Sequence, residues 1–260
     1  MRHTPPMITK QPNRFGWRPD SPDHRDLVLK SSRFVIKALP PSADLRADMP
    51  EIWDQGNLGS CVANAVGSLY QHADMAEGTD PWFMPSRLYL YYNARALDHT
   101  VPYDAGTTIR NGIKSIVRCG LCPEEIWPYD IAKFSKRPSS AAYKAAVEAK
   151  IMKYGRVLQN EAQIKAQIAD GSPVAFGFSV FNNFDLIGPE NNWTVPMPDD
   201  SGIQGGHAVV AVAYDDAARL FTIRNSWGNA WGLGGYFYMT YDFLLNQDIC
   251  SDFWVIKWAP

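Results

Sequence analysis

Three polar residues, far apart in the sequence, have the types that nucleophilic catalysis requires. Cys61 stands in QGNLGSCVANA, His207 in GGHAVVAVAYDD and Asn225 in RNSWGNAWGLGGYF. A cysteine nucleophile needs a base within hydrogen-bond reach, and that base needs a third group that fixes its tautomer. The side-chain oxygen of an asparagine can do this for an imidazole ring. The three residues therefore predict a thiolate nucleophile, its base and the group that orients the base.

Cys61 also stands where local structure would favour its thiolate. The apolar residues that follow it have helical spacing, namely Val62, Ala65, Val66, Leu69, Tyr70 and Ala73. Cys61 is thus expected to open a helix, whose N-terminus carries partial positive charge. Taken singly, the residues have simpler interpretations, because most free cysteines are buried and inert and a lone histidine is often a core residue. The combination favours catalysis.

The elements that would position these residues change type along the chain. Helical spacing recurs over about 86–97, 107–118 and 139–153, and Asn160 is expected to cap a short helix that ends near Gly171. The runs PVAFGFSVF, HAVVAVAYDD, LFTIRNSW and GYFYMTYDF are then typical of strands. A long loop, 182–206, joins the first two runs, and loops of that length are more often functional than idle. The pattern predicts an α+β protein with two lobes.

These motifs resemble the papain family of cysteine peptidases. The resemblance also includes SPVAFGF and GLCPEEIWPYD, and it covers the chain from about Leu39 onward. It implies a papain-like two-lobed α+β fold. A helical lobe (39–150) would carry the nucleophile, an antiparallel β-barrel-like lobe (151–260) would carry the histidine and asparagine, and the active-site cleft would lie between them. The implied activity is peptide hydrolysis through an acyl-thioester on Cys61, without a metal or organic cofactor.

The resemblance implies roles for further residues. Gln55 matches the side chain that donates to the oxyanion, and Trp227 would shield the Asn225–His207 bond from water. Ala105 and Gly106 stand where the family has a glycine pair that binds the substrate backbone. Gly206, directly before the histidine, is a further candidate for substrate binding.

The sequence departs from the family pattern at three positions. Leu58 replaces the usual cysteine, so the disulfide made there in the family is missing. Val62 replaces an aromatic residue beside the nucleophile, and Ala105 puts a methyl group where the first glycine of the pair would be.

Residues 1–38 form a polar, proline-punctuated arm with too few apolar positions for a core. The family resemblance suggests a propeptide that lies across the cleft and makes the chain a zymogen. Phe15, Trp17 and 27–29 would be its apolar anchors. The alternative is a structural belt on the outside of the enzyme, for which Trp17 and the charged run PDHRD would serve equally well.

The other three cysteines, Cys119, Cys122 and Cys250, leave several interpretations open. A zinc site needs about four ligands, and no second CxxC pair or nearby HxxxH accompanies CGLC. Reduced packing cysteines are favoured over a disulfide, for which Cys250 is one candidate partner, and over a metal site.

Composition restricts the partners. A net charge of −2 over 260 residues leaves no basic excess for nucleic acid, and no apolar run is long enough to span a membrane. No Sec-type signal peptide is evident, so the chain is expected to be cytoplasmic or exported by a route without one. A peptide or protein substrate and a monomeric state are expected. The alternatives are an inactive binding module that keeps the fold, and a transpeptidase or amidase that uses the same triad.

Overall fold

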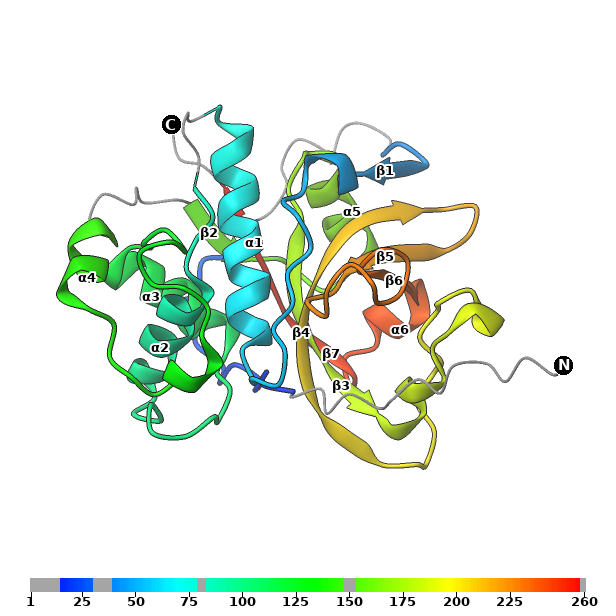
Figure 1. Cartoon of the computed structure of the whole chain (residues 1–260). Coiled ribbons are helices and arrows are strands. Elements are labelled where there is room, and N and C mark those ends of the chain that lie inside the picture. The colour runs from blue at the N-terminus through cyan, green and yellow to red at the C-terminus, as the bar shows by residue number, and fades with distance from the viewer. Residues whose placement is uncertain (1–14, 30–38, 79–82, 147–152, 258–260) are drawn as a thin grey trace, which may run out of the picture.

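The computed structural model describes residues 15–29, 39–78, 83–146 and 153–257. Helices lie on both sides of one antiparallel sheet: α1 runs between the sheet and α2, α3 and α4, while α5 and α6 lie on the other side (Figure 1). The described helices are α1 (Cys61–Ala76), α2 (Arg87–Leu97), α3 (Ile109–Cys119), α4 (Ser140–Ala146), α5 (Glu161–Ala169) and α6 (Tyr241–Leu245), with short 3-10 turns at Arg46–Asp48, Ile131–Lys133, Asn182–Leu186 and Pro189–Asn191. The α+β class predicted from the sequence is confirmed.

The sheet has seven strands in the order β2-β7-β3-β4-β5-β6, and β1 pairs with β4. The strands are β1 (Ser42–Asp44), β2 (Lys153–Arg156), β3 (Val174–Phe181), β4 (Ile203–Asp215), β5 (Leu220–Arg224), β6 (Tyr236–Thr240) and β7 (Cys250–Lys257). Every pair is antiparallel. The ladder between β3 and β7 shifts register between Ala175 and Gly177, which marks a bulge in β7 at Asp252 and Phe253.

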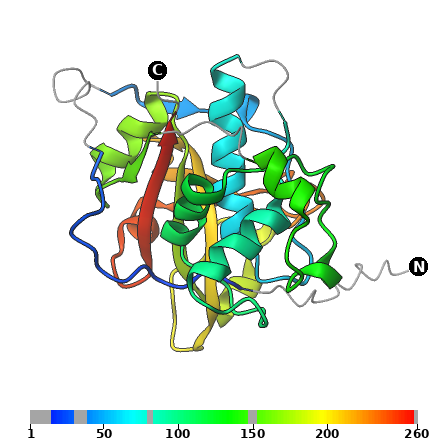
Figure 2. The same ribbon diagram turned by 90° about the vertical axis from the view of Figure 1, so that its left-hand side faces the viewer.

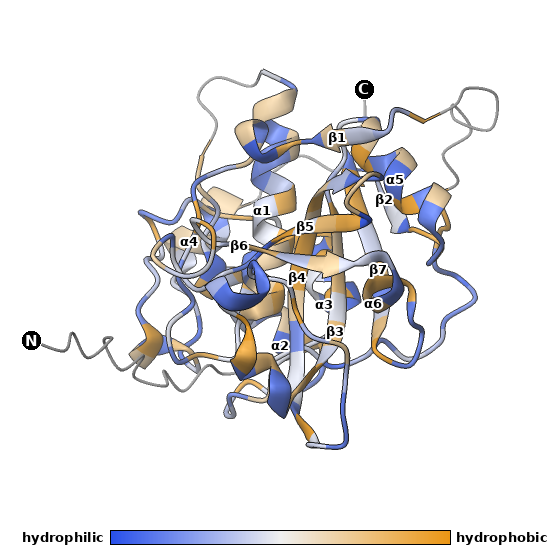
Figure 3. Ribbon diagram, turned by 90° about the vertical axis from the view of Figure 1, so that its right-hand side faces the viewer, coloured by the Kyte–Doolittle hydropathy of each residue, from blue (hydrophilic) through white to orange (hydrophobic). Residues whose placement is uncertain are grey.

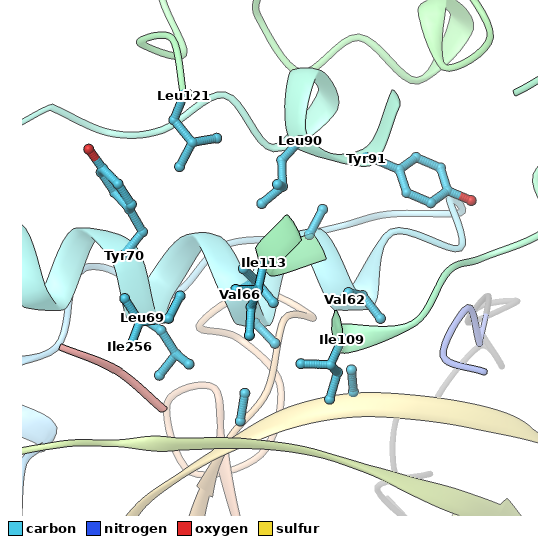
Figure 4. Close-up of a cluster of buried hydrophobic side chains, with 14 of the residues drawn as sticks. Val62, Val66, Leu69, Tyr70, Leu90, Tyr91, Ile109, Ile113, Leu121 and Ile256 are labelled. Carbon is cyan, nitrogen blue, oxygen red and sulfur yellow. The ribbon is translucent and has the colours of Figure 1, made fainter. Parts of the chain in front are cut away.

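Two apolar cores cover the sheet. The first lies between the helices and the sheet, where Val62, Val66 and Leu69 of α1 meet residues of α2, α3 and β7 (Figure 4). The second is rich in aromatic residues and lies between the sheet, α5 and α6. Apolar colour accordingly follows the strands, and hydrophilic colour dominates the loops (Figure 3). The first core fixes α1, and with it Cys61, against β4.

Most predicted elements are present, with differences at their ends. The capped helix is α5, in which the Asn160 side chain accepts from the backbone of Gln163 at 2.9 Å. Helix α4 ends at Ala146, and Lys153 begins a strand, so the helix expected over 139–153 is too long; 147–152 lie outside the described residues. The run GYFYMTYDF contains a strand only to Thr240, because α6 begins at Tyr241. Strands β1, β2 and β7 were not predicted.

The long loop is shorter than expected, since two 3-10 turns occupy its first part and β4 already begins at Ile203. All four cysteines are free thiols. Among the described residues, none of the helices is long and apolar enough to cross a membrane. The division of the chain at 38/39 and 150/151 stays a prediction.

Part of the arm, 15–29, is described, and it runs past β7 and β2 (Figure 2). Leu29 N–H donates to the Arg156 carbonyl at 2.9 Å, and Arg156 N–H donates to the Leu27 carbonyl at 2.8 Å. This short parallel pairing adds the arm to the free edge of β2. Residues 1–14 and 30–38 of the arm lie outside the described ranges.

Candidate active site

Cys61 is the first residue of α1, and the loop before it is tied to the helical side. Gly59 N–H donates to both carboxylate oxygens of Asp104 at 3.1 Å, and the Tyr91 hydroxyl donates to the same carboxylate at 2.5 Å. The backbone N–H of Ala208 donates to the Cys61 sulfur, so that sulfur lies beside the residue that follows His207. Cys61 and His207, which are 146 positions apart in the sequence, meet here.

His207 lies on β4 and Asn225 directly follows β5, its antiparallel neighbour. His207 Nε2 and Asn225 Oδ1 are 2.8 Å apart, and both residues are buried. Asn225 Oδ1 also accepts from Ser226 N–H at 2.8 Å, which identifies this atom as the oxygen. Because a carbonyl oxygen only accepts, Nε2 must carry the imidazole proton.

The other ring nitrogen of His207 is left with its lone pair. His207 Nδ1 has no hydrogen-bond partner among the described residues. In the neutral ring this nitrogen is an acceptor, and it can take a proton from a thiol. The arrangement thus holds the tautomer that the sequence argument requires of a base.

Aromatic rings enclose the histidine. The Trp227 ring stacks on His207 with centroids 5.0 Å apart, and Phe178 meets it edge-on at 5.8 Å. Trp231 and Phe184 in turn pack against Trp227. The contact expected between Trp227 and the histidine is present, and both His207 and Asn225 are buried.

Gln55 joins the cysteine loop to the asparagine loop. Its Oε1 accepts from the Ser226 hydroxyl at 2.6 Å, and its Nε2 donates to the Leu58 carbonyl at 2.8 Å. Its backbone N–H donates to the Ser226 carbonyl at 2.9 Å. The side-chain oxygen therefore faces Ser226, and the donating nitrogen faces the loop that leads into Cys61.

Among the predicted substrate-binding positions, Gly206 and Gly106 contact the arm and Ala105 is exposed. Trp17 N–H donates to the Gly206 carbonyl at 2.9 Å. Thr107 N–H donates to the Gly16 carbonyl at 2.8 Å, and its own carbonyl accepts from Arg18 at 3.1 Å. Sequence reasoning missed Thr107, for which the only signal was its place next to Gly106.

The close approach of the arm depends on glycines. A Cβ on Gly106 would lie 2.0 Å from the Gly16 oxygen, and one on Gly16 would lie 1.8 Å from the Gly59 oxygen. A Cβ on Gly177 would lie 1.9 Å from the Trp17 ring, which is only 6% exposed. No side chain larger than hydrogen fits these positions while the arm lies there.

The arm also covers Cys61 and His207. Gly16 N–H donates to the Cys61 sulfur. The Phe15 ring lies edge-on to His207 with centroids 5.9 Å apart, and 6.2 Å from the Trp227 ring. Both Cys61 and His207 are 0% exposed.

Burial keeps both groups neutral. It raises the pKa of the Cys61 thiol to about 11, although backbone N–H groups of Ala208, Gly16 and Val62 oppose the shift. It lowers the pKa of His207 to about 4, against the hydrogen bond to Asn225. Desolvation disfavours the charged form of each group, so in this covered state it outweighs the helix N-terminus. The thiolate expected from the sequence is therefore not favoured here.

The remaining residues singled out in the sequence are packed side chains. Leu58 and Val62 belong to the first core, Cys122 and Cys250 are buried, and Cys119 is half-buried. Across the described ranges, no group of three or more His, Cys, Asp and Glu side chains is arranged to hold a metal ion.

Comparisons with known proteins agree with this geometry. Residues 39–251 match the model of the family described as papain family cysteine protease. A peptidase C1-like protein of Acanthamoeba polyphaga mimivirus is 36% identical over 94% of this chain and 86% of its own length. The crystal structure of xylellain, a cysteine protease from Xylella fastidiosa, has a TM-score of 0.87 at 42% identity, and the match covers 96% of this chain and 98% of that one. A procathepsin B of Trypanosoma congolense shares the fold, with a TM-score of 0.72 at 15% identity over 95% of this chain and 86% of that one.

Proposed function

This chain belongs to the papain family of cysteine proteases, and from that premise we propose that Cys61 is its nucleophile, His207 its base and Asn225 the residue that orients the base. The observation that carries the assignment is the pairing of His207 Nε2 with Asn225 Oδ1 at 2.8 Å. It leaves the lone pair of Nδ1 for the thiol proton, beside a sulfur that Ala208 holds close.

The reaction then proceeds in two stages. His207 Nδ1 takes the proton of the Cys61 thiol, and the sulfur attacks the carbonyl carbon of the peptide bond. The oxyanion accepts hydrogen bonds from Gln55 Nε2 and the Cys61 backbone N–H. His207 returns the proton to the leaving amine, and an acyl-thioester remains. A water molecule gives a proton to His207, attacks the thioester carbonyl, and releases the acid and the thiol.

The substrate backbone would use the partners that the arm uses. Gly206 offers a carbonyl acceptor on one side, and the segment from Ala105 through Gly106 to Thr107 offers a backbone edge on the other. Trp227 keeps the histidine–asparagine bond dry. All the proposed catalytic groups come from one chain, and we propose that the enzyme acts as a monomer.

The arm is the proposed restraint on this peptidase. Phe15, Gly16 and Trp17 contact His207, Cys61 and Gly206, the groups that a substrate has to reach. A peptide cannot enter while these three residues stay. The arm also has the contacts expected of a belt, since 18–29 pack along α3, β2 and β7. The two interpretations of the arm therefore apply to different parts of it, and only the first part would block the reaction.

The test is Cys61→Ala in the full chain, assayed with a panel of fluorogenic peptides and a thiol-trapping epoxide. Cys119→Ser is the matched control, because this cysteine is also a free thiol but lies outside the site. We expect hydrolysis and epoxide labelling to vanish in the first variant and to persist in the second. Residual hydrolysis in Cys61→Ala would refute the nucleophile assignment. Labelling without turnover of any peptide would favour an amidase or transpeptidase, and neither labelling nor turnover would favour a binding module.

A further inference from the structure

We propose that the arm is held by a proton-dependent latch, in which Asp252 of β7 shares a buried charge cluster with Asp20 of the arm and docking tightens as the pH falls. The inference rests on the proposed role of the arm as a restraint. It concerns a different part of the arm from the residues that cover Cys61.

The cluster joins the arm to α3, β2 and β7. Arg156 donates to all three carboxylates, at 2.8 Å to Asp20, 2.6 Å to Asp26 and 3.1 Å to Asp252. Arg110 donates to Asp26 through Nε at 3.0 Å and through Nη2 at 2.5 Å. Asp20, Asp26 and Asp252 have side chains only 0%, 7% and 5% exposed.

Asp20 and Asp252 are in direct contact through the arm backbone. The N–H of Asp20 donates to Asp252 Oδ2 at 2.7 Å, while the Asp20 carboxylate accepts from Trp254 Nε1 at 2.9 Å and from Arg110 N–H at 3.2 Å. The two carboxylates are therefore held side by side, away from water. Removing the arm would leave Asp252 with Arg156 and solvent.

The charges of the cluster do not balance. When all groups are ionised, three carboxylates face two guanidinium groups, which leaves one uncompensated negative charge. Arg110 of α3, Arg156 of β2 and Asp252 of β7 belong to the folded part of the chain that the arm docks on. The arm contributes Asp20 and Asp26. Docking thus brings two carboxylates against a site that already has one. Nearby on the arm, Asp23 pairs with Arg25 and lies 4.0 Å from Lys114, at the outer side of the cluster.

Asp252 is the member that takes up the proton. Burial, followed by the charge of Asp20, raises its pKa from 3.8 to about 6, although Arg156 and the Asp20 N–H oppose the shift. Asp26 differs, because hydrogen bonds from Arg110 and Arg156 overcome its burial and lower its pKa. Asp252 also has a left-handed backbone (φ 59°) next to the β3–β7 bulge, which aims it at the arm.

The sign of the effect follows from linkage. A carboxyl whose pKa is higher in the docked state than in the free state binds a proton on docking, so docking gains strength as the pH falls. The gain is complete below the pKa of the free state and is lost as the pH rises through about 6. A shift of one pKa unit is a factor of ten, so up to roughly 10²-fold in the docking equilibrium depends on this proton. The arm is therefore held more weakly toward neutral pH and more tightly in acid.

The test compares labelling of Cys61 by iodoacetamide in the full chain and in its Trp17→Ala variant from about pH 4.5 to 8. The variant lacks the ring that packs against Gly177 and Gly206, so the ratio of the two rates at each pH compares labelling with and without that ring, and Asp252→Asn shows which part of the pH dependence belongs to the latch. We expect the ratio of full chain to variant to rise on the order of tenfold to 10²-fold with pH. In parallel, hydroxyl-radical oxidation of Trp17 in the full chain reports docking without using Cys61.

Asp252→Asn is the decisive variant, because asparagine mimics the neutral carboxyl and accepts the left-handed backbone well. We expect Asp252→Asn to keep the ratio of labelling rates at its low-pH value over the whole pH range. The extent of Trp17 oxidation should likewise stay at its low-pH value. The matched control is His24→Gln, which replaces an exposed side chain of the same arm outside the cluster and should leave the pH dependence intact.

The outcomes separate the latch from the proposed function. Trp17 oxidation that does not vary with pH, or that varies equally in Asp252→Asn, overturns the latch. If Cys61 is unreactive in every variant while Trp17 oxidation follows the pH and loses this dependence in Asp252→Asn, the latch stands and the nucleophile assignment fails. If labelling is equal with and without the Trp17 ring while oxidation behaves as expected, the latch stands and occlusion fails.

Discussion

The two ends of the described arm are held by opposite kinds of interaction. Phe15 to Trp17 is an apolar plug, in which the Phe15 ring lies against His207 and the buried Trp17 ring lies against Gly177 and Gly206. Residues 18–29 are held by charge and by backbone pairing, with Arg110 and Arg156 as the main partners. The plug has no titrating side chain of its own, whereas the charged end contains buried carboxylates. One end would therefore block the chemistry, and the other would set the conditions under which the block is released.

The largest expected effect comes from removing the plug. Trp17→Ala deletes a ring that is 6% exposed, a change that costs roughly 3–5 kcal/mol in a packed core. We expect kcat/KM on a fluorogenic peptide and the rate of Cys61 alkylation to rise by about 10²–10³, in proportion to the open fraction. Leu27→Ala is the control, since this arm side chain is 58% exposed and lies outside the plug. Equal rates in Trp17→Ala and the full chain would show that the plug does not restrain the enzyme.

A larger side chain on β3, opposite the Trp17 ring, should also raise the rate of Cys61 alkylation without any change in the arm itself. Gly177→Val would put side-chain atoms into the space of the Trp17 ring, because even a Cβ there would lie 1.9 Å from it. We expect faster alkylation of Cys61, by about tenfold to 10²-fold, as the plug is expelled. The control is Gly188→Ala, which adds a side chain to a glycine outside the site. Gly171 is less suitable for this purpose, because its positive φ would strain any side chain placed there. Unchanged alkylation in Gly177→Val would mean that the ring can move aside at little cost.

A substitution at the charged end should raise the rate of Cys61 alkylation less than Trp17→Ala does. It should have the larger effect on how firmly residues 18–29 stay docked. Asp26→Asn removes the charge that Arg110 and Arg156 share, and a hydrogen bond to a charged group contributes about 1.5–3 kcal/mol. We expect the rate of Cys61 alkylation to rise about tenfold and proteolysis within 18–29 to become faster. Asp242→Asn, at an exposed ion pair elsewhere, should change neither. A rise as large as that of Trp17→Ala would erase the distinction between the two ends.

The sequence predicted the catalytic side better than the arm. Val62, Val66 and Leu69 repeat with helical spacing because one face of α1 is buried, so local spacing was enough to place Cys61 at a helix start. The motifs around His207 and Asn225 likewise lie on or after strands that their β-branched and aromatic residues predict. These features can be predicted because they depend on residues close together in the sequence.

The contacts of the arm could not be predicted in this way, because they join residues that are far apart in the sequence. Asp20 and Asp252 are 232 positions apart, and neither stands in a pattern that names the other. Strand β7 escaped prediction, and with it the bulge that turns Asp252 toward the arm. The raised thiol pKa also depends on which groups cover Cys61, whereas the helix N-terminus that argued for a thiolate is a local feature. The pKa of Cys61 and the contacts of the arm therefore depend on burial by residues distant in the sequence, which local sequence patterns do not show.

The pH dependence of the nucleophile should differ between the covered and the uncovered state of Cys61. In the covered chain, burial raises the pKa of the Cys61 thiol to about 11 and lowers that of His207 to about 4, so the neutral pair persists across the pH range between them. Trp17→Ala readmits water, which favours the thiolate and the imidazolium. The thiol pKa should then fall and the imidazole pKa should rise.

Alkylation of Cys61 by iodoacetamide, an uncharged reagent, measures the thiolate directly. We expect the Trp17→Ala variant to show a rising acidic limb well below the free-thiol value of about 8.5, because the helix N-terminus and the imidazolium then stabilise the thiolate. The limb belongs to the coupled cysteine–histidine pair and not to either residue alone. In Asp26→Asn, where the plug residues are intact, molecules that stay closed remain unreactive, so the rate should rise without a comparable shift of the limb. A limb near 8.5 in Trp17→Ala would mean that uncovering alone does not activate Cys61, and that the two ends of the arm differ only in how strongly they hold it.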